Sequence, residues 1–137
     1  MRKAVVCLAL LFLVALLPSL TFTEDQATVH LARTIYALAR DESYETKLAI
    51  ASVVMNRVEN PWYEGTLEEV LSSQHQFPSG ERYDAQSLQA AHAAIAGKRN
   101  LPGDVLYYQA ADAPNPWTEG LYRVIGGYAF YTEDGNF

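Results

Sequence analysis

The segment from residue 31 to residue 58, LARTIYALARDESYETKLAIASVVMNRV, most constrains the fold, because it predicts two helices joined by a short acidic turn. Apolar residues recur at helical spacing from Gln26 to Arg40, so the first helix begins before this segment. These apolar residues are Val29, Ala32, Ile35, Tyr36 and Ala39. We therefore expect a helix over residues 26–40 with one apolar face.

The turn at residues 41–43 carries side chains that suit the N-terminus of a second helix, over residues 44–59. This helix is small or apolar on nearly every side, which favours a central position in the fold. Asn60 and Pro61 end it. Its expected buried stripe consists of Leu48, Ala51, Val54, Met55 and Val58.

The rest of the chain predicts shorter elements. Thr66 and Glu69 form a capping box that opens a helix ending at Ser72. A further helix covers residues 84–96, with Gly97 as its C′ residue. Residues 105–109 predict a short strand, and residues 122–125 and 128–131 predict a hairpin around two glycines. The fold class is therefore α+β, dominated by helices, with a small antiparallel sheet late in the chain.

The first residues have the layout of a secretory signal. Arg2 and Lys3 precede a continuous apolar run over residues 4–17, which Pro18 ends. An uncleaved membrane anchor is the alternative, although the run is shorter than the roughly 20 residues of a spanning helix. We expect residues 1–25 to be the signal and residues 26–137 one secreted or cell-envelope domain. Cys7, the sole cysteine, lies within the apolar run, so the domain itself contains no cysteine.

Charge and motif content narrow the partners. Without Arg2 and Lys3, eight basic residues stand against sixteen acidic ones, a net charge near −8. This argues against a nucleic-acid partner but leaves an uncharged glycan open. The three histidines are far apart in the sequence and predict no metal site. No Gly-rich phosphate loop or other cofactor motif appears, so we expect no cofactor.

Carboxylate chemistry remains the best-supported option. Cleavage of a glycosidic bond needs a protonated acid that donates to the leaving oxygen, and a single Glu serves if its surroundings raise its pKa. Glu42 and Glu45, in and just after the acidic turn, are the best-placed candidates. The structural alternative is that both only stabilise the N-terminus of the following helix.

A collinear series of short motifs resembles the SleB-type cell wall hydrolases, the family of spore cortex-lytic enzymes. The first helix and turn contribute LARTIY at 31–36, Ala39-Arg40 and ESYE at 42–45, and the second helix ends in NRV at 56–58. Further matches are Gln76-Phe77, LPG at 101–103, LYY at 106–108, Trp117 and IGGYAFY at 125–131. The resemblance covers residues 31–131.

This resemblance implies a lysozyme-like fold that binds the glycan strands of peptidoglycan. It also implies lytic transglycosylase chemistry on the bond between N-acetylmuramic acid and N-acetylglucosamine, with one Glu as acid and then base. Membrane contact is expected only through an uncleaved N-terminal segment, and the sequence leaves open whether a protein partner exists. The substrate-binding residues that it implies are Arg40, Gln76, Tyr107, Trp117, Tyr128 and Tyr131.

The chain departs from the family pattern where chemistry is expected. The pattern Glu-Ala-Arg-Gly-Glu, whose first Glu is the acid, reads LARDE at 38–42, so Leu38 occupies the acid position. Pro78 and Tyr128 replace a serine and a histidine of the pattern. Three interpretations follow: a hydrolase or transglycosylase with Glu42 as substitute acid, a catalytically inactive glycan-binding or regulatory module, or a purely structural secreted domain.

Overall fold

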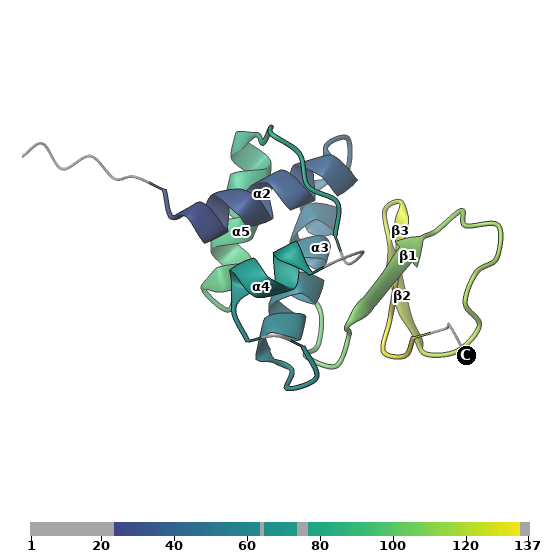
Figure 1. Cartoon of the computed structure of the whole chain (residues 1–137). Helices are drawn as coiled ribbons and strands as arrows, with labels where there is room; N and C mark the ends of the chain where they lie inside the picture. Colours follow the sequence, from purple (N-terminus) through teal and green to yellow (C-terminus); the bar gives the residue numbers. More distant parts are fainter. Residues whose placement is uncertain (1–23, 64, 74–76, 135–137) are drawn as a thin grey trace, which may run out of the picture.

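The computed structural model describes residues 24–63, 65–73 and 77–134, which form a helical part and a small sheet beside it (Figure 1). The predicted signal, apart from its last two residues, lies outside this range, as do His75 and Gln76. No helix in the described residues is both long enough and apolar enough to cross a membrane.

Helices α2 (Gln26–Ala39) and α3 (Tyr44–Glu59) confirm the two helices that the sequence predicts over residues 26–40 and 44–59. Ser43 caps α3, because its hydroxyl accepts a 3.4 Å hydrogen bond from the Thr46 main-chain nitrogen. Residues 40–43 between α2 and α3 are not helical, so Leu38 and Glu42 do not share a helix.

The central position of α3 is confirmed, but the predicted buried stripe was too narrow. Leu48 and Val58 are only half-buried, whereas every residue from Thr46 to Arg57 other than Leu48 is buried. The reason is that α3 contacts elements on all sides: the other helices α2, α4 and α5, and strands β1 and β2. A single stripe predicts one buried face, while this helix has no solvent-facing side over three turns.

Helix α4 (Leu67–Ser72) begins after Thr66, whose hydroxyl accepts a 3.1 Å hydrogen bond from the Glu69 nitrogen, as predicted. Helix α5 (Ala85–Ile95) is capped by Asp84 and followed by Gly97 at φ +88°, the left-handed conformation that glycine favours. Because α5 is rich in alanine, it packs closely against both α2 and α3.

The sheet contains β1 (Tyr107–Ala110), β2 (Leu121–Ile125) and β3 (Tyr128–Tyr131) in the order β1-β3-β2, with both pairs antiparallel. The predicted hairpin around residues 126 and 127 is confirmed. The predicted strand over 105–109 was placed too early. Val105 and Leu106 precede β1 because their carbonyl groups accept hydrogen bonds from side chains of α3 and not from a neighbouring strand. Asn56 donates to Val105 O at 3.0 Å, and Arg57 donates to Leu106 O at 2.7 Å.

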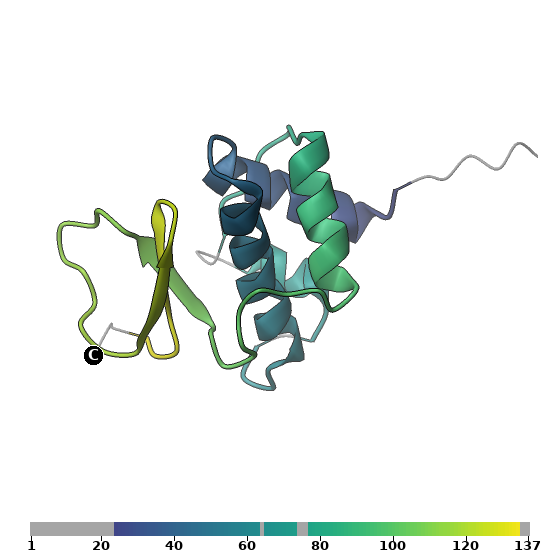
Figure 2. The same cartoon turned by 180° about the vertical axis from the view of Figure 1, so that it is seen from behind.

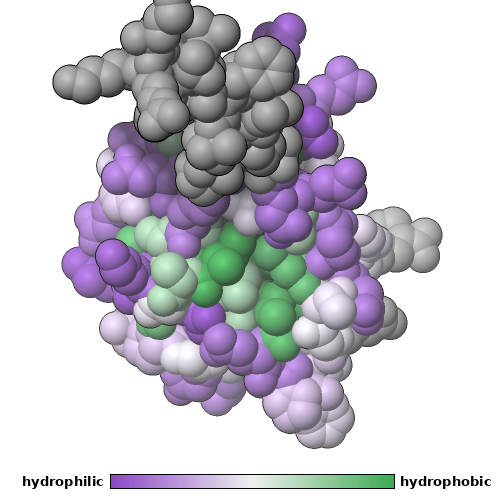
Figure 3. Space-filling view, turned by 90° about the vertical axis from the view of Figure 1, so that its left-hand side faces the viewer, coloured by the Kyte–Doolittle hydropathy of each residue, from purple (hydrophilic) through white to green (hydrophobic). Residues whose placement is uncertain are grey.

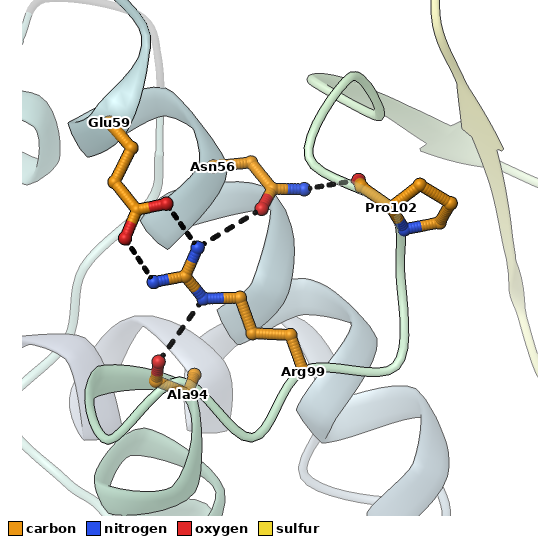
Figure 4. A network of polar contacts seen from close by, with 5 residues as sticks. All are labelled: Asn56, Glu59, Ala94, Arg99 and Pro102. Carbon is orange, nitrogen blue, oxygen red and sulfur yellow. Dashed lines mark hydrogen bonds and ion pairs between the residues drawn. The ribbon is translucent and has the colours of Figure 1, made fainter.

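A polar network around Arg99 fixes the connection between the helices and the sheet (Figure 4). Its guanidinium donates to both oxygens of Glu59 at 2.6 Å and to Asn56 Oδ1 at 3.4 Å, while Nε donates to Ala94 O at 3.2 Å. Asn56 in turn donates to Pro102 O at 2.7 Å. The segment that crosses α3 on its way from α5 to β1 (Figure 2) is thus tied to both helices.

Candidate functional site

The turn between α2 and α3 touches the tip of the β2–β3 hairpin. Glu42 Oε1 accepts a 3.1 Å hydrogen bond from the Gly127 nitrogen. A Cβ atom on Gly127 would lie 2.3 Å from this oxygen, and one on Gly126 would lie 2.4 Å from Thr46 Oγ1. Gly126 also has φ +56°. The two glycines therefore allow an approach of hairpin and turn that side chains would prevent.

Leu38 lies in the last turn of α2, next to this contact. Its side chain is half-buried and packs on the margin of the apolar core. Its main-chain carbonyl accepts a 2.5 Å hydrogen bond from the Tyr128 hydroxyl. Two positions at which the sequence departs from the family pattern are thus in direct contact. Neither an alkyl side chain nor a phenol engaged in this way supplies a carboxylic acid.

A row of aromatic rings continues from Tyr128. Its ring meets that of Tyr108 edge to face, with centroids 6.0 Å apart, and Tyr108 stacks on Phe77 at 5.8 Å with an interplanar angle of 9°. Burial raises the pKa of the Tyr108 phenol, and burial followed by the charge of Glu42 raises the pKa of Tyr128. Both hydroxyls remain neutral hydrogen-bonding groups at ordinary pH.

Arg57 holds the far end of the row. Its guanidinium carbon lies 4.7 Å from the Phe77 ring centroid, 5.2 Å from that of Tyr63 and 5.8 Å from that of Tyr107. Burial lowers the pKa of Arg57, and burial raises the pKa of Tyr63 to about 12. The predicted binding residue Tyr107 is therefore part of a cation–π cluster that anchors the row to α3.

Trp117 and Tyr131 form a separate pair. Their ring centroids are 5.0 Å apart, and the Tyr131 hydroxyl donates to Trp117 O at 3.4 Å. Strand alternation places Tyr131 and Tyr128 on opposite faces of β3, and Tyr131 is only 3% exposed. The structure therefore does not bring this pair together with Leu38 and Glu42.

The remaining candidates lie near the turn or outside the described range. Arg40 is exposed and pairs with exposed Asp41 at 3.4 Å. Pro78 is exposed, and Gln76 is not among the described residues. Glu45 is also exposed, with one oxygen 3.9 Å from Arg123. Across the part of the chain that the structure describes, no three His, Cys, Asp or Glu side chains gather as a metal-binding group.

Residues 41–131 match the family model described as Cell Wall Hydrolase, which is more than half of the chain. The chain belongs to the cell wall hydrolase family. The matched range begins after Leu38 and Arg40. The correspondence of Leu38 with the family acid therefore stays a prediction, as do the roles predicted for the site residues.

Individual members of the cell wall hydrolase family agree with this assignment. The spore cortex-lytic enzyme of Bacillus subtilis (strain 168) is 30% identical over 108 residues, 73% of this chain but 35% of that enzyme, so the chain spans about a third of its relative. The catalytic domains of SleB from Bacillus cereus and of the germination-specific lytic transglycosylase SleB from Bacillus anthracis share the fold. Each has a TM-score of 0.69 at 24% identity, covering 81% and 82% of this chain and 94% and 99% of the respective domain. The predicted family and fold class are confirmed.

Sequence reasoning missed two parts of this site. The contact between Glu42 and Gly127 joins residues 85 positions apart and leaves no local pattern. The row formed by Phe77, Tyr108 and Tyr128 depends on which side of β1 faces the helices. Alternation along Tyr107 and Tyr108 does indicate that one of two adjacent tyrosines faces inward.

Proposed function

We propose that this chain is a secreted member of the cell wall hydrolase family that binds the glycan strands of peptidoglycan without cleaving them by the lytic transglycosylase mechanism. One observation carries the proposal. Leu38, predicted to occupy the position of the family acid, carries no carboxyl group, and its main-chain carbonyl accepts a hydrogen bond from the Tyr128 hydroxyl.

Glu42, the nearest candidate for a substitute acid, is already in use. One of its oxygens accepts from the Gly127 main-chain nitrogen, and the hairpin tip packs against the carboxyl group. A general acid must reach the leaving oxygen of the substrate within hydrogen-bond distance. Both carboxyl oxygens of Glu42 lie against the hairpin glycines, Oε1 beside Gly127 and Oε2 beside Gly126, so the carboxyl group is directed at the hairpin tip. These contacts support a structural role for Glu42.

The aromatic row and exposed Arg40 support retained glycan binding. Sugars stack their apolar faces on aromatic rings, and guanidinium groups donate to sugar oxygens. Phe77 and Tyr128 are both half-buried, so each ring presents part of its surface to solvent. The same rings also pack against the hydrophobic core, so their exposed parts are what supports glycan binding.

An active enzyme with Glu42 as acid is the second candidate, favoured by the position of this carboxyl group beside Tyr128. The test incubates the full chain, purified in mild detergent, with purified peptidoglycan. Sedimentation measures binding and mass spectrometry measures release of anhydro-muropeptides. We expect binding without release. Release that disappears in Glu42→Gln but persists in Glu45→Gln would establish the active alternative.

A gain-of-function variant tests where the defect lies. Leu38→Glu restores the carboxyl group, and Leu38→Glu combined with Tyr128→His also restores the histidine of the family pattern. We expect release of anhydro-muropeptides from the double variant, with Leu38→Gln plus Tyr128→His as the uncharged control. No release from the double variant, despite normal binding and folding, would mean either that Leu38 does not occupy the acid position or that another departure from the pattern, such as Pro78, also blocks catalysis.

A further inference from the structure

A second site lies on the other half of α2. A partly open hollow of about 420 Å³ lies between the N-terminal half of α2, helix α4 and the segment after α4. His30 and Arg33 line it from α2, Glu68 from α4, and Ser79 from the segment that leads to α5. Its volume falls within the range of sites for small ligands.

The two carboxylates in this hollow have ion-pair partners, but one nitrogen of its arginine has no hydrogen-bond partner among the described residues. Glu68 accepts from His30 Nδ1 at 2.8 Å, and Glu24, which also lines the hollow, lies 2.9 Å from His92 Nε2. Each carboxylate thus has a histidine partner. Arg33 differs, because its Nε is buried and has no hydrogen-bond partner among the residues that the structure describes. A buried donor without an acceptor is destabilising until a ligand supplies one.

The missing acceptor has a definite chemistry. A guanidinium group binds a carboxylate through two parallel hydrogen bonds. Two carboxylates line the same hollow, so they would repel a doubly charged phosphate. A ligand with one carboxylate and nearby N–H donors fits better, because its carboxylate can bind Arg33 while its N–H groups donate to the glutamates. Val29 adds an apolar wall to the hollow. On the face where α2, α4 and α5 meet, an apolar patch lies within a hydrophilic rim (Figure 3).

We infer that this hollow binds the carboxylate end of a short peptide, with Arg33 as the carboxylate-binding residue and the glutamates as acceptors for peptide N–H groups. The inference rests on the proposed function, since peptidoglycan carries such peptides on its glycan strands. The peptide would then contact α2 between Gln26 and Arg33, and the glycan would contact its last turn near Leu38.

The experiment tests the peptide site and the glycan site separately, with a short peptide in one assay and peptide-free glycan strands in the other. The full chain in mild detergent is titrated with the peptide acetyl-Lys-D-Ala-D-Ala and with its C-terminal amide. Binding is followed through the Arg33 Nε–H resonance in ¹⁵N NMR spectra. We expect the acid to shift this resonance and to bind about tenfold or more tightly than the amide. Equal binding of acid and amide, or no shift of Arg33, would overturn the inference.

Matched variants distinguish a loss of peptide binding from a loss of folding. Arg33→Gln should weaken peptide binding about tenfold or more, whereas Arg82→Gln, which removes the same charge from an exposed loop position, should not. Val29→Trp should fill the hollow and abolish peptide binding with Arg33 intact. Binding of peptide-free glycan strands should be unchanged in all three variants. If those strands bind and the peptide does not, this inference fails while the proposed function stands.

Discussion

The Tyr128 hydroxyl donates a 2.5 Å hydrogen bond to the Leu38 carbonyl, although the two residues are 90 positions apart in the chain. This bond fastens the β2–β3 hairpin to the end of α2. It sits beside the contact of Glu42 with Gly127, so the hairpin and the α2–α3 turn are held at two adjacent points. The region in which the family pattern expects catalysis is braced by the protein's own side chains.

The Tyr128 hydroxyl should contribute to stability. Tyr128→Phe removes the bond to Leu38 and leaves a half-buried carbonyl without this donor, so we expect a loss of about 1 kcal/mol in the free energy of unfolding. Urea denaturation measures this loss. Tyr122→Phe is the control, because Tyr122 is 46% exposed on β2. Equal stability of both variants and the parent chain would show that the bond is not formed in solution.

Gly126 should tolerate no side chain. Gly126→Ala places a Cβ atom against Thr46 Oγ1 and Glu42 in a left-handed backbone conformation. We expect a destabilisation of at least about 1 kcal/mol from the backbone alone. Gly103→Ala is the matched control, since a Cβ there meets nothing within 4 Å. Thermal unfolding of the two variants should therefore differ clearly, and similar values would contradict the close packing of turn and hairpin.

Asp84 should make the stability of α5 depend on pH. Hydrogen bonding from Ser87, whose main-chain nitrogen donates to Asp84 Oδ1 at 2.7 Å, holds the pKa of Asp84 below its usual value. Since the folded pKa is depressed, the stabilisation is present above the unfolded pKa of about 4 and is lost as pH falls through the folded pKa. Asp84→Ala should cost about 1 kcal/mol at neutral pH.

The matched variant for this prediction is Asp84→Asn, which keeps a capping oxygen but cannot titrate. Urea denaturation at neutral pH and near pH 3, below the unfolded pKa of about 4, should show a smaller acid-induced loss for Asp84→Asn than for the parent chain. An identical loss in both would mean that other carboxylates, and not this cap, cause the acid sensitivity.

Arg99 should couple α3 to the segment before β1. Its bond with Glu59 raises the pKa of Arg99 and lowers that of Glu59. Glu59 is largely exposed, so solvent screens the pair, and a coupling of only about 1 kcal/mol is expected from a double-mutant cycle of Arg99→Ala and Glu59→Gln. The single Arg99→Ala change should cost more, because it also removes the bonds to Ala94 and Asn56. Exposed Arg82→Ala should cost little.

Most of the fold could be predicted because its signals are local. The capping residues Ser43, Thr66 and Asp84 sit within three positions of the nitrogens that they cap. The start of β1 could not be predicted in this way. Val105 has a strand-forming side chain, but its carbonyl group bonds to Asn56, 49 residues earlier.

The site was less predictable than the fold, because its contacts join residues that are far apart in the sequence. The motif placed Leu38, Glu42 and Tyr128 in one family pattern, and the structure brings these three together. It separates Trp117 and Tyr131 from them, because strand alternation turns Tyr131 to the other face. Arg33 belongs to the LARTIY motif, but nothing in the sequence around it indicated a ligand site, since the hollow also needs side chains from α4 and from Ser79.

The buried amide and guanidinium of Asn56 and Arg57 have a consequence for the nascent chain. Their acceptors at Pro102, Val105 and Leu106 are made 46 to 49 residues after them. When α3 leaves the ribosome, two of its polar groups have no acceptor from the segment that will bury them. The central helix can therefore reach its final packing only after residues 102–106 have emerged, so a chain that stalls before residue 102 would be a target for chaperones and proteases.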